Sequence, residues 1–158
     1  MSLLDFFQWC EQSAIGEHIR RSAWLFPLIE AIHLLGLGVI GGAVLVVDLR
    51  LLRLGLRRQS VAQLARDVQP WLIGSLILMI ATGTLLFLSE AIKCYYHPAF
   101  WFKMASLFLA ILFTFTVQRK VTLADERPGR PFWRGVVAVI SVLLWSGVGI
   151  GGRWIGFS

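Results

Sequence analysis

The sequence predicts an all-α membrane protein: a bundle of four spanning helices preceded by an amphipathic helix at the membrane surface. Hydrophobic residues make up 57% of the 158 residues and charged residues only 15%. That is too little polar surface for a water-soluble domain of this length. Four long apolar segments follow one another along the chain, and most basic residues lie between them. The length suits a single transmembrane domain over residues 1–158.

The four apolar segments are each about 18–24 residues long, and at about 1.5 Å per residue this is enough to cross a hydrocarbon layer of about 30 Å. Backbone polar groups in lipid must be hydrogen-bonded within their own segment, so we expect helices. The predicted spans are residues 24–47, 71–92, 100–117 and 136–155.

Before the first span, the stretch LLDFFQWCEQSAIGEHI mixes aliphatic and aromatic residues with polar ones. This pattern predicts an interfacial amphipathic helix. Two G-x-x-x-G pairs, Gly38 with Gly42 and Gly147 with Gly151, predict close contacts between spanning helices.

The positions of the basic residues predict the orientation. Ten of the fifteen Lys and Arg residues lie in two connections, the first between spans one and two and the second between spans three and four. They are Arg50, Arg53, Arg57, Arg58 and Arg66, and then Arg119, Lys120, Arg127, Arg130 and Arg134. Connections rich in Lys and Arg stay cytoplasmic. We therefore expect a bacterial inner (plasma) membrane protein with both termini periplasmic, in contact with the lipid bilayer and not with nucleic acid.

Two ionisable residues lie inside the first span. Counted from Trp24 at about 1.5 Å per residue, Glu30 lies about 9 Å deep and His33 about 13 Å deep. Residues three apart share one helix face. Charged groups that face lipid are unfavourable, so we expect both side chains to point into the bundle.

The other spans bring ionisable groups to the same, outer half. Glu90 ends span two, Lys103 begins span three and Arg153 ends span four. Such clustering inside a membrane indicates a functional site. The structural alternative is a network in which Glu30 pairs with Lys103 and His33 bonds to a Ser, a Thr or a carbonyl group. At the cytoplasmic end of span one, we expect Asp48 and Arg50 to form an ion pair.

The leading hypothesis is a haem b site that serves membrane electron transfer, with quinone as a possible electron partner. Imidazole from a spanning helix is a common axial ligand, and His33 is the candidate. Glu30 would orient or buffer it, and Lys103 and Arg153 would neutralise the propionates. The candidates for the second ligand are His97, Met104 and Met79.

Two other classes stay open. One is a metal-ion site or transport path, with His33 and His97 as the candidate histidines, for which Glu30-x-x-His33 has the spacing of carboxylate-bridged metal bundles. Copper would use His33, Met104 and Cys94. The other is a cofactor-free structural or accessory membrane subunit, which could form a homo-oligomer.

Other sequence features carry less weight. Cys10 and Cys94 are both expected on the outer side, where either a disulfide bridge or two free thiols would be compatible with the sequence. Phosphate-binding loops, dinucleotide-binding glycine patterns and serine-nucleophile elbows are absent from the sequence. A kinase or hydrolase therefore has no support.

Four phrases carry a resemblance to a known family: IGEHIRRSAWLFPLIEAIHLLGLGVIGG, VDLRLLRLGL, ATGTLLFLSEA and HPAFWFK. Together they resemble small bacterial four-helix integral membrane proteins that share a domain of unknown function. The resemblance covers roughly residues 13–110, and it is strongest at Trp24, Pro27, Glu30 and His33 and at the Asp48-Leu49-Arg50 triplet. It implies a four-helix inner-membrane fold and no established activity.

A looser likeness is to CopD-type copper proteins and membrane b-type cytochromes, in which a histidine in an early span precedes a glycine-rich segment. This likeness would carry over only His33 as a ligand. The third span departs from the pattern, because FTFTVQR has no histidine near its cytoplasmic end. A second, inner haem is therefore not expected.

Overall fold

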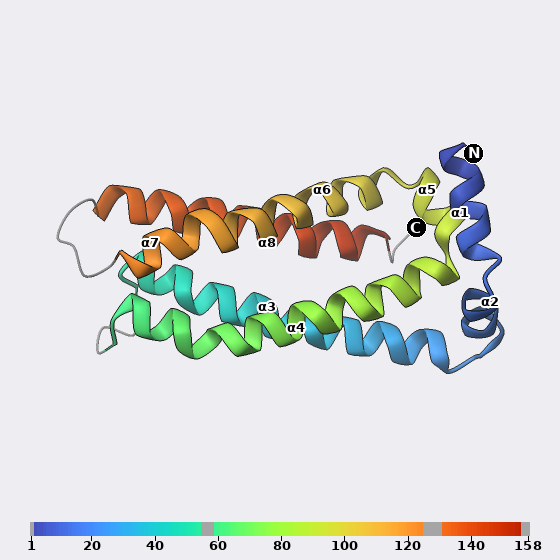
Figure 1. Ribbon diagram of the computed structural model, residues 1–158, viewed down its shortest axis with the longest axis horizontal. Helices are drawn as coiled ribbons and strands as arrows, with labels where there is room; N and C mark the ends of the chain where they lie inside the picture. Colours follow the sequence, from blue (N-terminus) through green and yellow to red (C-terminus); the bar gives the residue numbers. More distant parts are fainter. Residues whose placement is uncertain (1, 55–58, 125–130, 156–158) are drawn as a thin grey trace.

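The computed structural model describes residues 2–54, 59–124 and 131–155, and within these ranges all regular structure is helical. Four long helical segments run side by side along the molecule (Figure 1). They are α3 (Leu25–Leu51), α4 (Val61–Ser89), the continuous segment α6 (Pro98–Phe113), η1 (Thr114–Gln118) and α7 (Arg119–Leu123), and α8 (Pro131–Ile155). Each is long and apolar enough to cross a membrane. The chain is therefore a multi-pass membrane protein, and the predicted all-α four-helix bundle is confirmed.

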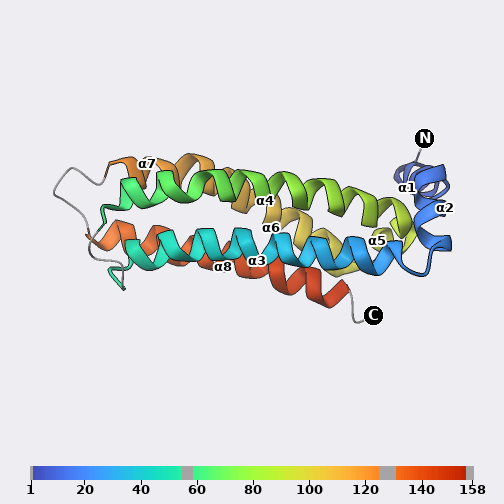
Figure 2. The ribbon, with the colours of Figure 1, turned by 90° about the horizontal axis from the view of Figure 1, so that it is seen from below.

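The two ends of the bundle differ. Three short helices gather at one end, around the last turn of α4 (Figures 1 and 2): α1 (Leu3–Glu11), α2 (Ala14–Arg21) and α5 (Ala91–Tyr96). We call this the α5 end. At the opposite end lie α7, the last turn of α3 and the first turns of α4 and α8 (Figure 1). We call this the α7 end.

The N-terminal segment forms two helices, not one, and both pack onto the bundle. Ser2 and Ser13 cap them by accepting backbone N–H groups in the first turn, each at 3.2 Å. Phe7 and Cys10 of α1 lie in a buried cluster with Ala91 and Cys94 of α5. The apolar face of α1 thus packs against the end of the bundle, as the amphipathic pattern of the sequence indicates.

Arg20 of α2 links the N-terminal helices to the end of α4 through hydrogen bonds. The Arg20 guanidinium donates to the carbonyl oxygens of Ser89 and Glu11, both at 2.9 Å. Ser89 is the last residue of α4, where carbonyl groups lack helical partners and a cation is favourable. Cys10 and Cys94 are both free thiols in this region.

The core is apolar along the middle of the bundle. α3 packs mainly on α4, and α6 on α8. The largest core cluster joins all four segments: Ile40, Ala43, Val44, Leu72, Met79, Ala110, Trp145 and Val148. Each segment thus contributes to one continuous core.

The predicted glycine contacts are half confirmed. Gly147 and Gly151 face α6, where an added Cβ would lie 3.1 Å from Ser106 Oγ and from Lys103 Cβ respectively. Gly38 and Gly42 face open space, so the prediction of a contact there is wrong. The glycine of α3 that meets another helix is Gly36, where a Cβ would lie 3.1 Å from Met79 Cγ.

The helices extend beyond the predicted spans. α4 begins ten residues early, at Val61, because Ser60 caps it and because Val61 packs in a second core cluster with Val47 and Leu51. It ends at Ser89, and the non-helical backbone of Glu90 separates α5 from it. The third segment continues past residue 117 through one π-helical stretch, η1. Hydropathy alone marks the lipid-like part of each helix and misses its polar ends.

Six of the ten clustered basic residues lie at the α7 end: Arg50, Arg53, Arg66, Arg119, Lys120 and Arg134. The other four, Arg57, Arg58, Arg127 and Arg130, lie outside the described residues.

Candidate cofactor-binding site

A cavity of about 250 Å³ lies among the four spans toward the α5 end. Its apolar wall includes Phe26, Leu37, Leu86, Phe100 and Val148. Its ionisable and sulfur-bearing lining comes from five helices and from the junction of α4 and α5. These residues are Glu30, His33, Met79, Glu90, Lys93, Cys94, Lys103 and Arg153. The predicted gathering of Glu30, His33, Glu90, Lys103 and Arg153 at one end of the bundle is therefore present.

His33 is the buried centre of this site, with 8% of its surface exposed. Its Nδ1 lies 2.8 Å from the Thr82 hydroxyl oxygen. That hydroxyl already donates to the Leu78 carbonyl oxygen at 2.7 Å, so its oxygen accepts from the imidazole and the proton lies on Nδ1. In this tautomer the Nε2 atom carries a lone pair.

This tautomer is the one that a ligating histidine adopts. A histidine that binds a metal through one ring nitrogen usually donates the other N–H to a protein acceptor, which fixes the ring and raises its basicity. Gly83, the residue after Thr82, lets the ring lie against α4, because a Cβ there would come 3.2 Å from His33 Cε1. The Thr82-Gly83 pair therefore both orients the imidazole and makes room for it.

The structural alternative predicted from the sequence is half right. His33 does bond to a threonine, but the predicted ion pair between Glu30 and Lys103 is absent from the described residues. Glu30 lines the cavity yet is exposed. Lys103 makes no hydrogen bond or ion pair in the described part of the chain.

The cationic side chains line one side of the cavity. Lys103 lies along α8, so that a Cβ at Gly152 would be 3.4 Å from its Nζ. Arg153 follows on the same helix and also lines the cavity. Lys93 forms an ion pair with Glu90 at 3.8 Å. The two side chains are 42% and 38% exposed, so solvent weakens the pair.

Of the three candidates for a second ligand, only Met79 lies in the cavity. It is buried and contributes to both the cavity and the core. Met104 is 44% exposed and does not line the cavity, so the structure does not bring it together with His33. α-Helical spacing explains this, since Lys103 and Met104 are adjacent and point about 100° apart.

His97 is also placed elsewhere. It is the N-cap of α6, and its Nδ1 accepts the Ala99 backbone N–H at 3.2 Å. This bond satisfies one of the free donors of a helix N-terminus. His97 does not line the cavity, so the structure does not bring it together with His33.

The metal-site hypothesis gains little from the geometry. Residues 2–54, 59–124 and 131–155 contain no group of three or more His, Cys, Asp or Glu side chains that could hold a metal ion. Cys94 lines the cavity, but burial and then the Glu90 charge raise the pKa of its thiol to about 11. The thiol is therefore protonated at neutral pH.

The sequence did not lead us to predict a second polar cluster, which lies at the α7 end. Asp48 is completely buried, and the Gln118 amide donates to its Oδ1 at 2.7 Å. The predicted Asp48–Arg50 ion pair is wrong, because Arg50 instead donates to the Gln59 carbonyl oxygen at 2.9 Å. Helical periodicity could have predicted the burial of Asp48, because Asp48 continues the buried stripe of α3 that runs from His33 through Ile40 and Val44.

Comparison with known proteins gives a family and no activity. The model of a family described as "Family of unknown function (DUF6644)" matches residues 6–158. No curated protein and no solved structure matches the chain significantly.

Proposed function

Since the chain belongs to this family of unknown function, we propose its function from the cavity alone: the protein binds haem b through His33 and carries electrons within the membrane. One observation carries the proposal. A buried imidazole donates from Nδ1 to Thr82 and leaves Nε2 available beside a cavity of about 250 Å³. Haem would supply one-electron redox chemistry there.

The other lining residues fit the same group. Met79 is the proposed second ligand, because its thioether lines the cavity and is held in the core. Lys103 and Arg153 are placed to meet propionates, since both line the cavity and Lys103 has no partner among the described residues. Glu30, at the exposed side, would buffer charge near the imidazole.

The proposed location is the bacterial inner membrane, with the α7 end in the cytoplasm and the cavity toward the periplasm. Six described basic residues at the α7 end support this orientation. A lipid-soluble quinone is the proposed electron partner, because the cavity lies among the spanning helices.

The test is a visible absorption spectrum of the purified protein before and after dithionite. We expect a Soret band that shifts on reduction and disappears in His33→Ala. Met79→Leu should retain haem with a lower reduction potential, since a thioether ligand raises it. Met104→Leu, at the exposed methionine of α6, is the matched control and should leave the spectrum unchanged.

A second candidate is a copper(I) site, favoured by one observation. An imidazole, a thioether and a thiol, from His33, Met79 and Cys94, line the same cavity, and such ligands select copper(I). A colourless protein that contains copper by elemental analysis would support this candidate and overturn the haem proposal. A colourless, metal-free protein would leave the accessory-subunit hypothesis.

A further inference from the structure

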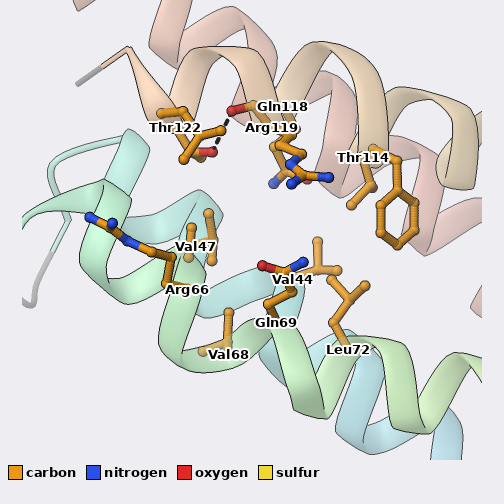
Figure 3. A pocket seen from close by; sticks show the side chains of 13 residues that line it. Val44, Val47, Arg66, Val68, Gln69, Leu72, Thr114, Gln118, Arg119 and Thr122 are labelled. Atoms are coloured by element: carbon orange, nitrogen blue, oxygen red, sulfur yellow. Dashed lines mark hydrogen bonds between the residues drawn. The ribbon is translucent and has the colours of Figure 1, made fainter. Parts of the chain in front are cut away.

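A second cavity, of about 240 Å³, lies at the α7 end between α3, α4 and the η1–α7 segment. Figure 3 shows its lining from the facing helices. The apolar wall is formed by Val44, Val68, Leu72 and Phe115. A cavity with such a wall, between helices long and apolar enough to span a membrane, suits an acyl chain or another apolar group.

The polar lining of this cavity is cationic. Arg66 and Gln69 come from α4, and Gln118 and Arg119 come from the opposite segment (Figure 3). Arg66 donates only through Nε, to the Ala62 carbonyl oxygen at 3.3 Å. Arg119 and Gln69 make no side-chain hydrogen bond or ion pair in the described part of the chain. Most guanidinium donors are therefore available to a ligand.

Among the described carboxylates, Asp48 is bonded to a lining residue. It is completely buried and accepts the Gln118 amide at 2.7 Å. Asp67 is exposed and does not line the cavity. The described lining residues thus carry two positive charges and no negative one.

The wall that carries Gln118 and Arg119 is held in place by other helices. η1 is a π-helical stretch, a form often found at functional sites. Its first residue, Thr114, accepts the Trp145 indole N–H at 3.1 Å, and its last, Gln118, is bonded to Asp48. These bonds to α8 and α3 fix the polar wall before any ligand binds.

We infer that this cavity binds an anionic phospholipid, with its phosphate between Arg66 and Arg119 and an acyl chain along Val44, Val68 and Leu72. Guanidinium groups bind phosphate through paired hydrogen bonds. Basic pockets between spanning helices are known to take anionic head groups. The site is distinct from the His33 cavity, so the inference does not depend on haem binding.

The test is native mass spectrometry of the purified protein with phosphatidylglycerol or phosphatidylcholine of identical acyl chains. We expect phosphatidylglycerol to bind preferentially and the Arg66→Gln/Arg119→Gln double variant to bind it at least about tenfold more weakly, since two charge-assisted contacts are lost. Arg53→Gln/Lys120→Gln is the matched control. It removes two charges from the same end outside the cavity and should bind as the unaltered protein does.

Four further results test the inference. Val68→Phe fills the apolar wall without changing charge and should also weaken binding of phosphatidylglycerol. Equal binding of the two lipids, or equal losses in the two double variants, would overturn the inference. Displacement of the lipid by millimolar inorganic phosphate would also overturn it, because the cavity would then recognise the free anion and not the lipid.

Discussion

The two cavities are alike in volume and different in chemistry. They measure about 250 Å³ and about 240 Å³ and lie toward opposite ends of the same four helices. The cavity at the α5 end has an imidazole, a thioether and charges of both signs, whereas the described lining at the α7 end has two arginines and an apolar wall. One helix face of α3 supplies a buried polar group to each half, His33 to one and Asp48 to the other.

The difference lies in how each buried group is satisfied. His33 uses one nitrogen for Thr82 and keeps the other available at its cavity. Asp48 is completely buried and bonds to Gln118, which itself lines the other cavity. At the first cavity the buried His33 itself would meet a ligand. At the second, the buried Asp48 holds Gln118 in place, and Gln118 and its neighbours line the cavity.

The largest expected effect comes from breaking the Asp48–Gln118 bond. Gln118→Leu leaves a buried carboxyl group without its amide donor, and we expect the free energy of unfolding to fall by about 3 kcal/mol. Reversible unfolding in detergent micelles measures this. The double variant Asp48→Leu/Gln118→Leu should recover most of the loss, because no stranded polar group remains. Two losses that simply add would show that the bond contributes little.

A smaller effect is expected at the other cavity. Thr82→Val removes the acceptor of the His33 Nδ1–H while keeping the side-chain shape, and should lower stability by about 1–2 kcal/mol. If the proposed haem site is correct, cofactor affinity should also fall by about 10–100-fold, because the ring loses its orienting partner. Thr82→Ser retains the hydroxyl and is the control. Unchanged stability and affinity in the valine variant would refute the role assigned to Thr82.

Glycine substitutions distinguish the inner face of the bundle from the outer one. Gly83→Ala places a Cβ 3.2 Å from His33 Cε1 and should lower stability by about 1 kcal/mol, since the ring must shift. Gly38→Ala places a Cβ in open space. It should leave stability unchanged or raise it by up to about 1 kcal/mol, because alanine favours the helix. Thermal unfolding of the two variants in parallel checks the contrast, which fails if both lose stability equally.

The sequence predicted the fold well because hydropathy and segment length respond directly to the bilayer. It also predicted that the His33 side chain is buried in the bundle, because a lone imidazole in an apolar span is visible in the chain. It did not predict which methionine shares the cavity, because Met79 and Met104 are equivalent until helix rotation is known. The prediction of an Asp48–Arg50 ion pair was wrong because it relied on their closeness in sequence and not on the buried helical stripe to which Asp48 belongs. The π-helical stretch that brings Gln118 to Asp48 has no clear signature in the residues.

The smallest expected effect separates two accounts of the polar cluster at the α7 end. The Ser141 hydroxyl faces the Asp48 carboxyl group, yet neither Ser141 Oγ nor Asp48 Oδ2 has a hydrogen-bond partner in the described part of the protein. Removing an unsatisfied buried hydroxyl relieves its desolvation, so Ser141→Ala should change the free energy of unfolding by less than about 0.5 kcal/mol. A loss above about 1 kcal/mol would mean that Ser141 donates to Asp48 in solution. The cluster would then be a closed network of three side chains, and its stability would no longer rest on Gln118 alone.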